Sequence, residues 1–567
     1  MKHFSIALSL AFALCTQASA QVQLANSFGD HMVLQRDVGA RVWGTAAPGK
    51  TVVIGFAGKS VTATAAKDGR WIVTLPPMPA NAEGRELVVT GSGGSRSDGS
   101  DSGDNDANDS VRIVDVLVGD VWVCGGQSNM AWTMRSSRDA DIEIESADTP
   151  QVRYLRVPNI ARAEPQADFP VESPTHKDGN WRLCTPEQVE DCTAVGYYFA
   201  RRLHRRLRIP IGIIDTSWGG TMAQHWCAKP TLRTFATVDS YFKSYEAKRK
   251  QWVDGGEEEG ASRRFDADVA TWEKAREAAK AAGERAPGRP NKRNYENPAH
   301  LAHPGAMFDG VIEPIKNTAL RGVVFYQGEN NSFGESWKPF SSTFPAVIRD
   351  WRRAFGVADL PFCNIQIAGW STRRSMTYDM NHHTNVVREV QLDTWLDTEN
   401  TGLIVTYDCN SNGSIHPARK LPVGERTARW ALAKVYGIKD RGNKRPIEWR
   451  GPLYEGMKIV DNKIVVSFVK ETARGLRLDK DVAFGFYVAG EDKTFHHALA
   501  RILGKTSEVE IWCDAVKQPV AARYGWSNLP AGTLLNGREL PAYPFRTDSW
   551  PLEPHQSTGA YVRGAGR

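Results

Sequence analysis

Short stretches of alternating apolar and polar residues dominate residues 21–90 of the chain. Alternation with a period of two is typical of half-buried strands, and Pro-Gly at 48–49 and Asp-Gly at 68–69 supply turns between them. The pattern predicts a small antiparallel β-sandwich. The clearest expected strands are Ala40–Gly44, Thr51–Gly55, Trp71–Leu75 and Leu87–Thr90.

Residues 111–440 alternate β-branched runs with longer stretches whose apolar residues recur at helical spacing. Such alternation predicts an α/β domain, a parallel sheet covered by helices on both faces. Two amphipathic helices are expected, at 194–208 and 423–436. The expected strands are Ile113–Cys124, Ile211–Thr216, Gly322–Tyr326, Phe362–Ile367 and Gly402–Tyr407.

Three other segments complete the expected organisation. Residues 91–110 lack any large apolar side chain and are interpreted as a flexible loop. Residues 240–295 are rich in Ala, Glu, Lys and Arg and are interpreted as an exposed helical insertion in the α/β domain. Strand-like patterns return at 445–560 and predict a C-terminal β region.

Residues 1–20 have the pattern of a signal peptide: a basic start, an apolar run at 4–14 and Ala18-Ser-Ala20 before the expected cleavage site. A buried first helix is the alternative. A signal peptide would make the mature protein secreted or periplasmic. An oxidising compartment would permit a bridge between Cys184 and Cys192, the closest cysteine pair, although spacing alone does not fix the pairing.

Composition limits the classes of partner. With 567 residues the chain suggests three or four domains, and its 41% hydrophobic content is that of a globular protein. The excess of 71 Lys and Arg over 65 Asp and Glu is small for this length and does not indicate a nucleic-acid partner. Beyond the N-terminus no apolar run is long enough to span a membrane.

Residues suited to catalysis follow the ends of the expected strands. The first strand leads into Gly-Gly-Gln-Ser-Asn-Met at 125–130, and a serine just beyond a strand end is well sited for nucleophilic attack. A helix N-cap is the alternative role for Ser128. The second strand leads into Ser-Trp-Gly-Gly-Thr at 217–221, whose glycine N–H groups suit a developing oxyanion.

The last two signals are amides and a histidine. Gln-Gly-Glu-Asn-Asn at 327–331 follows the third strand and offers side-chain donors. His416 follows the final strand, from where an imidazole could reach Ser128 and take its proton as a general base.

Four motifs together resemble the sialate O-acetylesterase family of SGNH-type hydrolases. Three of them are the glycine-rich blocks at 125–130, 217–221 and 326–331, and the fourth is Ile-His-Pro-x-x-Lys-x-x-x-Gly-x-Arg at 415–426. Matches at 28–35, 523–526 and 540–546 extend the resemblance to nearly the whole mature chain. It implies a three-layer α/β hydrolase domain flanked by β-rich regions.

The resemblance also implies roles for single residues. Ser128 would be the nucleophile and His416 the general base. The oxyanion hole would comprise the N–H groups of Ser128 and Gly220 and an amide from the 327–331 block. Gln327 and Asn331 are favoured as lining the site, and Asn330 stays open because the general SGNH pattern Gly-x-Asn falls on it.

One position departs from the family. Relatives commonly carry Asp two residues before the histidine, where this chain has Ser414. Loss of the acid that orients the histidine lowered activity about 10⁴-fold in a serine protease, so the departure matters. A backbone carbonyl, Asp408 or the Ser414 hydroxyl could replace it, and the hypothesis is a Ser-His dyad.

The function implied is hydrolysis of O-acetyl esters on sialic acid or other glycans through an acetyl-enzyme, with no cofactor and no metal. An acetylated carbohydrate is the expected partner. Two alternatives stay open: a deacetylase of acetylxylan or another polysaccharide, and a weak or inactive homologue that binds glycan without cleaving it.

Overall fold

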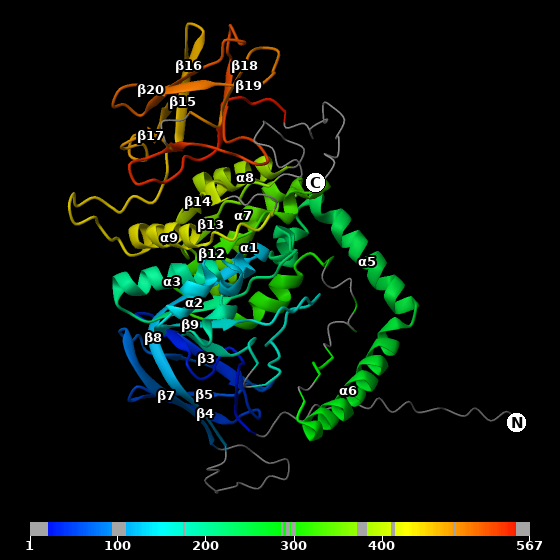
Figure 1. Ribbon diagram of the computed structural model, residues 1–567. Coiled ribbons are helices and arrows are strands. Elements are labelled where there is room, and N and C mark those ends of the chain that lie inside the picture. Colours follow the sequence, from blue (N-terminus) through cyan, green and yellow to red (C-terminus); the bar gives the residue numbers. More distant parts are fainter. Residues whose placement is uncertain are drawn as a thin grey trace, which may run out of the picture.

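The computed structural model describes residues 21–92, 109–173, 176–284, 287–290, 295, 297, 302–370, 383–409, 414–479 and 483–551. The expected signal peptide at 1–20 and most of the expected loop at 91–110 lie outside these residues. Three regions are stacked in Figure 1, with the N-terminal strands at the bottom and the C-terminal strands at the top.

The N-terminal region contains two antiparallel sheets whose inward side chains share one core. In β4, residues 52, 54 and 56 are buried and alternate with more exposed neighbours, as the sequence pattern predicts. One sheet contains β1 (Gln23–Leu24), β3 (Ala40–Thr45) and β6 (Arg70–Leu75). The other contains β4 (Thr51–Phe56), β5 (Lys59–Thr64) and β7 (Asn81–Ser92).

Strand β8 (Ser110–Gly126) runs from the N-terminal region into the central one. Its first half pairs antiparallel with β7, and residues 117–119 pair parallel with β2 (Val33–Gln35). Residues 120–126 then lie between two parallel strands of the central sheet. The expected start of the α/β domain at residue 111 therefore falls inside a strand that the two regions share.

The central sheet is parallel except at one edge, and its strand order is β10-β9-β11-β8-β12-β13-β14. β12 begins and ends at the residues expected from the sequence. The strands are β9 (Thr149–Arg156), the antiparallel β10 (Trp181–Cys184), β11 (Ile211–Asp215), β12 (Gly322–Tyr326), β13 (Phe362–Ile365) and β14 (Thr401–Ile404).

Helices cover both faces of this sheet, as the alternating pattern predicts. Gly196 of α3 (Ala194–Leu207) packs against Cys124, while the next residue, Gly125, packs against Trp351 of α7 (Phe340–Phe355). Since successive strand residues point to opposite faces, α3 and α7 lie on opposite sides. α9 (Leu421–Trp430) packs beside α3, and α8 (Thr384–Asp397) packs beside α7. A π-helical turn at 431–435 continues α9.

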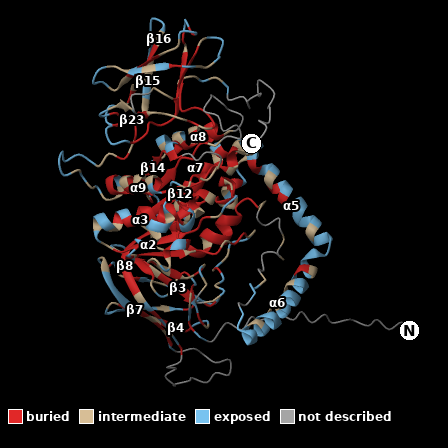
Figure 2. Ribbon diagram, in the orientation of Figure 1, coloured by how far each residue is buried: buried red, intermediate tan, exposed pale blue. Residues whose placement is uncertain are grey.

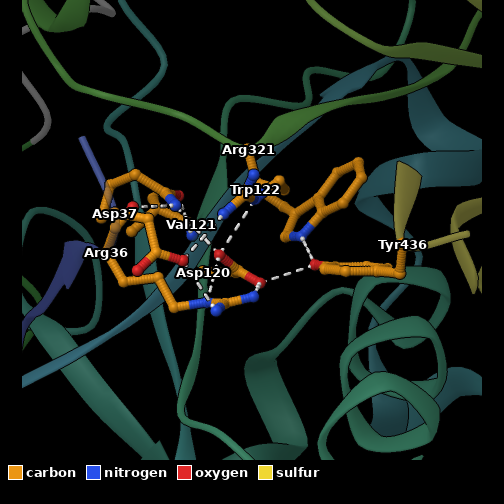
Figure 3. A network of polar contacts seen from close by, with 8 residues as sticks. Arg36, Asp37, Asp120, Val121, Trp122, Arg321 and Tyr436 are labelled. Atoms are coloured by element: carbon orange, nitrogen blue, oxygen red, sulfur yellow. Dashed lines mark hydrogen bonds and ion pairs between the residues drawn. The ribbon is translucent and has the colours of Figure 1, made fainter. Parts of the chain in front are cut away.

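A buried carboxylate fixes β8 where it enters the central sheet (Figure 3). Asp120 accepts hydrogen bonds from Gln35, Arg36, Arg321 and Tyr436. Burial alone would raise the pKa of Asp120, but the two guanidinium groups hold it below its usual value. These partners come from the N-terminal region, the start of β12 and the segment after α9, so one side chain ties three parts of the fold together.

The charged insertion forms two exposed helices, α5 (Asp239–Asp254) and α6 (Glu257–Ala282). They extend along one side of the molecule in Figure 1 and are mostly pale blue in Figure 2, which marks exposure. Phe242 and Tyr245 of α5 are buried and anchor this arm near its start. The exposed helices expected from the composition are therefore present.

The C-terminal region has a second hydrophobic core, which includes Leu403 and Val405 from the edge of the central sheet. One four-stranded sheet contains β15 (Tyr454–Val460), β16 (Lys463–Phe468), β20 (Leu499–Ile502) and β21 (Glu508–Trp512). The other contains β18 (Phe486–Ala489), β19 (His496–His497), β22 (Ala521–Tyr524) and β24 (Phe545–Arg546). β17 (Arg477–Leu478) pairs with β23 (Leu534–Leu535).

The cysteines and the helices provide two further observations. Cys184 and Cys192 are buried free thiols, so the structure has no bridge between them. Among the described residues, no helix is long and apolar enough to cross a membrane.

Candidate active site

The site is built where β8 ends beside β12. Gly126 closes β8 with a φ of +126°, and a Cβ there would lie 2.1 Å from the carbonyl oxygen of Tyr326. Only glycine allows the chain to turn this close to the neighbouring strand. Gln127 follows as the N-cap residue, and Ser128 is the first residue of the short helix α1 (Ser128–Ala131).

Ser128 and His416 meet at this edge although 288 positions separate them in the chain. The Nε2 atom of His416 lies 2.8 Å from Oγ of Ser128. Both side chains are half-buried rather than sealed in the core. With Nε2 unprotonated, the serine hydroxyl donates to the imidazole, which is the geometry that general-base activation requires.

The imidazole of His416 stacks on the indole of Trp132, with ring centroids 5.4 Å apart and planes inclined by 22°. Burial and the nearby Lys420 lower the pKa of His416 from its ordinary value. The lowered pKa favours the neutral imidazole, which is able to accept a proton.

Neither side chain considered as a substitute for the missing acid bonds to the imidazole. Both carboxylate oxygens of Asp408 accept from the guanidinium of Arg426. The hydroxyl oxygen of Ser414 accepts from the main-chain N–H of His416 at 3.0 Å. Among the residues described, which exclude 410–413, no hydrogen-bond partner of Nδ1 of His416 is found.

The amides of Gln327 and Asn331 are fully committed to other partners. Nε2 of Gln327 donates to Gln127 and to the carbonyl of Thr221, at 2.8 and 2.9 Å. Nδ2 of Asn331 donates to Gln224 and to the carbonyl of Ser336, at 3.2 and 3.0 Å. Both side chains are fully buried. The expectation that they line the oxyanion hole is corrected, since neither keeps an N–H for a substrate.

Asn330, which the sequence left open, has a different position. Its side chain is half-buried, and Nδ2 donates to the carbonyl of Gly220 at 2.7 Å, which leaves a second N–H. Gly220 is exposed with a φ of +77°, a conformation that favours glycine. A Cβ on the preceding Gly219 would lie 3.3 Å from Cβ of Ser128. Gly219 therefore lies beside Ser128, and Asn330 is bonded to the next residue, Gly220.

Sequence reasoning gave no role to Trp132 or Lys420. Lys420 is a fixed position of the motif around His416, so its motif membership was the available signal. Nothing in the sequence indicated that Trp132 would stack on the imidazole. In the described parts of the chain, no group of three or more His, Cys, Asp or Glu side chains is placed to hold a metal ion.

Comparisons with known proteins indicate the class of protein that the chain resembles. Residues 299–432 match the family model described as carbohydrate esterase, sialic acid-specific acetylesterase. A carbohydrate acetylesterase from Xanthomonas citri superimposes with a TM-score of 0.71 and 29% identity, over 93% of this chain and all of that one. The fold and the match support an ester hydrolase similar to the carbohydrate esterase class.

Within that class the similarity extends over the whole length of named relatives. The chain is 27% identical to human sialate O-acetylesterase, over 98% of each chain. It is 26% identical to the mouse sialate O-acetylesterase, over 96% of this chain and 97% of the relative. The resemblance to the sialate O-acetylesterase family that the four motifs predict is confirmed.

Proposed function

We propose that this protein is a carbohydrate O-acetylesterase in which Ser128 and His416 act as a catalytic dyad. The observation that carries the proposal is the 2.8 Å contact between the serine hydroxyl and the imidazole. The similarity to carbohydrate acetylesterases supports the substrate class.

In the first half of the reaction, Oγ of Ser128 attacks the carbonyl carbon of the acetyl group while its proton passes to Nε2 of His416. The resulting tetrahedral intermediate carries the negative charge on the former carbonyl oxygen. When it collapses, the bond to the sugar oxygen breaks, and His416 gives its proton to that oxygen. The sugar leaves and the acetyl group stays on Ser128.

Three N–H groups are proposed to stabilise the oxyanion. They are the main-chain N–H groups of Ser128 and Gly220 and the second side-chain N–H of Asn330. Because Asn330 already bonds to the Gly220 carbonyl, the two donors are held in one geometry before substrate arrives. Donors fixed in advance stabilise developing charge without reorganisation in the reaction step.

The second half of the reaction uses water. His416 takes a proton from water, the hydroxide attacks the acetyl carbon, and the same N–H groups receive the second oxyanion. Collapse breaks the bond to Oγ of Ser128, which regains the proton from His416. Acetic acid leaves and loses its proton to solvent as acetate, and the enzyme returns to its starting state.

The stacking of His416 on Trp132 is proposed to take over part of the orienting role that an aspartate has in a triad. A stacked ring keeps its plane, but the indole face cannot accept the Nδ1 proton, and it stabilises an imidazolium less than a carboxylate would. The dyad is therefore expected to turn over more slowly than an otherwise similar triad.

O-acetylated sialic acid is the first substrate to test, because the named relatives are sialate O-acetylesterases. Acetylxylan and other acetylated polysaccharides form the second group. The segment at 1–20 supports a secreted or periplasmic location, where such glycans are found.

The test measures acetate released from a panel of O-acetylated sialic acids, acetylxylan and other acetylated glycans. Wild type, Ser128→Ala and His416→Ala are compared on each substrate. The proposal expects release by wild type only, and the preferred substrate identifies the sugar. If wild type binds glycan as well as Ser128→Ala does and releases no acetate, the protein is a glycan-binding homologue instead.

A further inference from the structure

A buried amide next to the nucleophile bonds to two of the other loops of the site. Oδ1 of Asn129 accepts from the ammonium of Lys420. Nδ2 of Asn129 donates to a carboxylate oxygen of Glu329 and, at 3.1 Å, to the carbonyl of Ile415. The side chain of Asn129 is fully buried.

The two ionisable partners of this amide are almost as deeply buried, each with 2% of its surface exposed. Burial raises the pKa of Glu329 to about 7 and lowers that of Lys420 to about 7. The ammonium lies 5.6 and 5.5 Å from the ring centroids of Trp132 and Tyr326, which stabilise a cation. The amide is oriented to match, with its oxygen toward the lysine and its nitrogen toward the glutamate.

Two of the three contacts of Asn129, and Asn129 itself, lie next to residues of the proposed mechanism. Asn129 directly follows Ser128, Ile415 directly precedes His416, and Glu329 directly precedes Asn330. The nucleophile, the base and the oxyanion donor stand on three loops that are far apart in sequence. The side chain of Asn129 therefore connects the three segments that carry these residues.

We infer that Asn129, held between Lys420 and Glu329, is the positioning residue that aligns Ser128, His416 and Asn330. The inference rests on the proposed function and goes beyond it, because none of these three side chains has to touch the substrate. A misplacement of about 1 Å between reacting groups can lower a rate about 10²-fold, so losing the amide is expected to slow attack by Ser128.

Stability alone is a weak reason for this arrangement. Two buried ionisable side chains are often no more stabilising than well-packed apolar side chains of similar volume, because their charged forms lose hydration. One oxygen of Glu329 is also buried with no hydrogen-bond partner among the residues that the structure describes, which is unfavourable. Precise spacing of the three loops explains why the polar groups are there.

The test measures how fast a serine-directed fluorophosphonate labels Ser128, a reaction that needs the aligned dyad but no sugar. Asn129→Ala is compared with Asn536→Ala, a matched control in the C-terminal region. Asn536 is equally buried and also bonds at both ends, donating to Arg450 and Thr472 and accepting from Arg538 and Leu540.

We expect Asn129→Ala to be labelled about 10²-fold more slowly and Asn536→Ala at the wild-type rate, although both variants lose thermal stability. Equal labelling of Asn129→Ala and wild type would overturn the inference. So would equally slow labelling of both variants, which would show a general effect of a lost buried amide. A wild type that is not labelled at all would instead refute the proposed nucleophile.

A second pair of variants keeps the test open if Asn129→Ala does not fold. Glu329→Gln retains an oxygen that accepts from Asn129, whereas Glu329→Leu removes it. We expect Glu329→Gln to be labelled within a few fold of the wild-type rate and Glu329→Leu to be slowed about tenfold or more. Equal rates for the two variants would contradict the positioning role.

Discussion

The polar side chains at the two ends of the central part of β8 differ in burial and in hydrogen bonding. Asp120, at the start, is fully buried and accepts from the side chains of four residues (Figure 3). Ser128, just beyond the other end, is half-buried, and its hydroxyl bonds to His416. At one edge of the sheet, the strand therefore carries a carboxylate whose hydrogen-bond acceptor positions are used. At the other edge it leads to a hydroxyl that can still form further contacts.

This difference separates structural from chemical roles. A buried charge with all its partners in place stabilises the fold and has nothing left to offer a ligand. A partly exposed hydroxyl that faces a neutral imidazole has a proton to give and can be reached from solvent. The same comparison distinguishes Gln327 and Asn331, whose N–H groups are all used, from Asn330, which keeps one.

The largest effect on activity is expected for substitutions of Ser128 and His416. Ser128→Ala removes the nucleophile and His416→Ala the base, and each is expected to lower kcat for acetyl-ester hydrolysis by about 10⁴- to 10⁶-fold. Release of p-nitrophenol from p-nitrophenyl acetate measures the loss, with unfolding temperatures as the control for folding. If both variants turn over at the wild-type rate, the dyad is not the catalytic group.

The next largest effect on kcat is expected at Asn330, whose amide keeps a second N–H. Asn330→Ala removes one proposed oxyanion donor, and kcat is expected to fall about 10²- to 10³-fold while KM changes little. Steady-state kinetics on the preferred acetylated substrate provide the two constants. A change confined to KM would place Asn330 in ground-state binding rather than in stabilisation of the transition state.

The pH dependence of kcat/KM tests the assignment of His416 as the base. His416 must be neutral to accept the serine proton, so kcat/KM rises with pH through the pKa of His416 and falls about tenfold per pH unit below it. Burial and Lys420 lower that pKa, so the midpoint is expected below the ordinary histidine value of about 6.5. A pH profile with its midpoint well above that value would contradict the assignment.

A carboxylate restored beside the histidine is expected to help. Ser414→Asp introduces the acid that relatives carry at this position, and kcat is expected to rise about tenfold if orientation of His416 limits the rate. Ser414→Asn, which has nearly the same shape and no charge, is the matched control. Unchanged activity in Ser414→Asp would show that another group already holds the imidazole.

The smallest effect on activity is expected at the carboxylate end. Asp120→Asn removes the buried counter-charge of Arg36 and Arg321, which keep only their contacts with the exposed Asp37 among the described residues. The substitution is expected to lower the free energy of unfolding by about 3 kcal/mol, with kcat/KM within twofold of wild type. The depressed pKa of Asp120 means that its contribution is present at neutral pH and is lost as pH falls into the acid range. The difference in unfolding temperature should therefore narrow in acid.

Local patterns predicted the elements that local residues determine. β12 matches its predicted bounds, and α3 ends one residue before the expected limit, because each has a distinct apolar run or stripe. The shared role of β8 was not predictable in the same way. Its pairing with β7 and with β11 depends on segments far away in the chain, and a continuous apolar run fits either sheet.

The site shows the same division. The motifs predicted Ser128 and His416 as site residues. The two side chains are in contact in the structure because strand ends in a parallel sheet converge on one edge. The choice among Gln327, Asn330 and Asn331 depends on which way each amide points from one tight loop, and sequence spacing does not encode that direction. Likewise, sequence spacing does not show that the carboxylate of Asp408 bonds to the guanidinium of Arg426, which lies 18 residues away in the chain.

The most direct test of the central claim is to trap the covalent intermediate. Wild type is mixed with the preferred acetylated substrate, quenched with acid within the turnover time, digested and analysed by mass spectrometry, with Ser128→Ala treated in parallel. The dyad predicts an acetyl group on Ser128 in wild type and none at this position in the variant. Acetate release by wild type with an unmodified Ser128 throughout the time course, or with the acetyl group on another residue, would contradict the account.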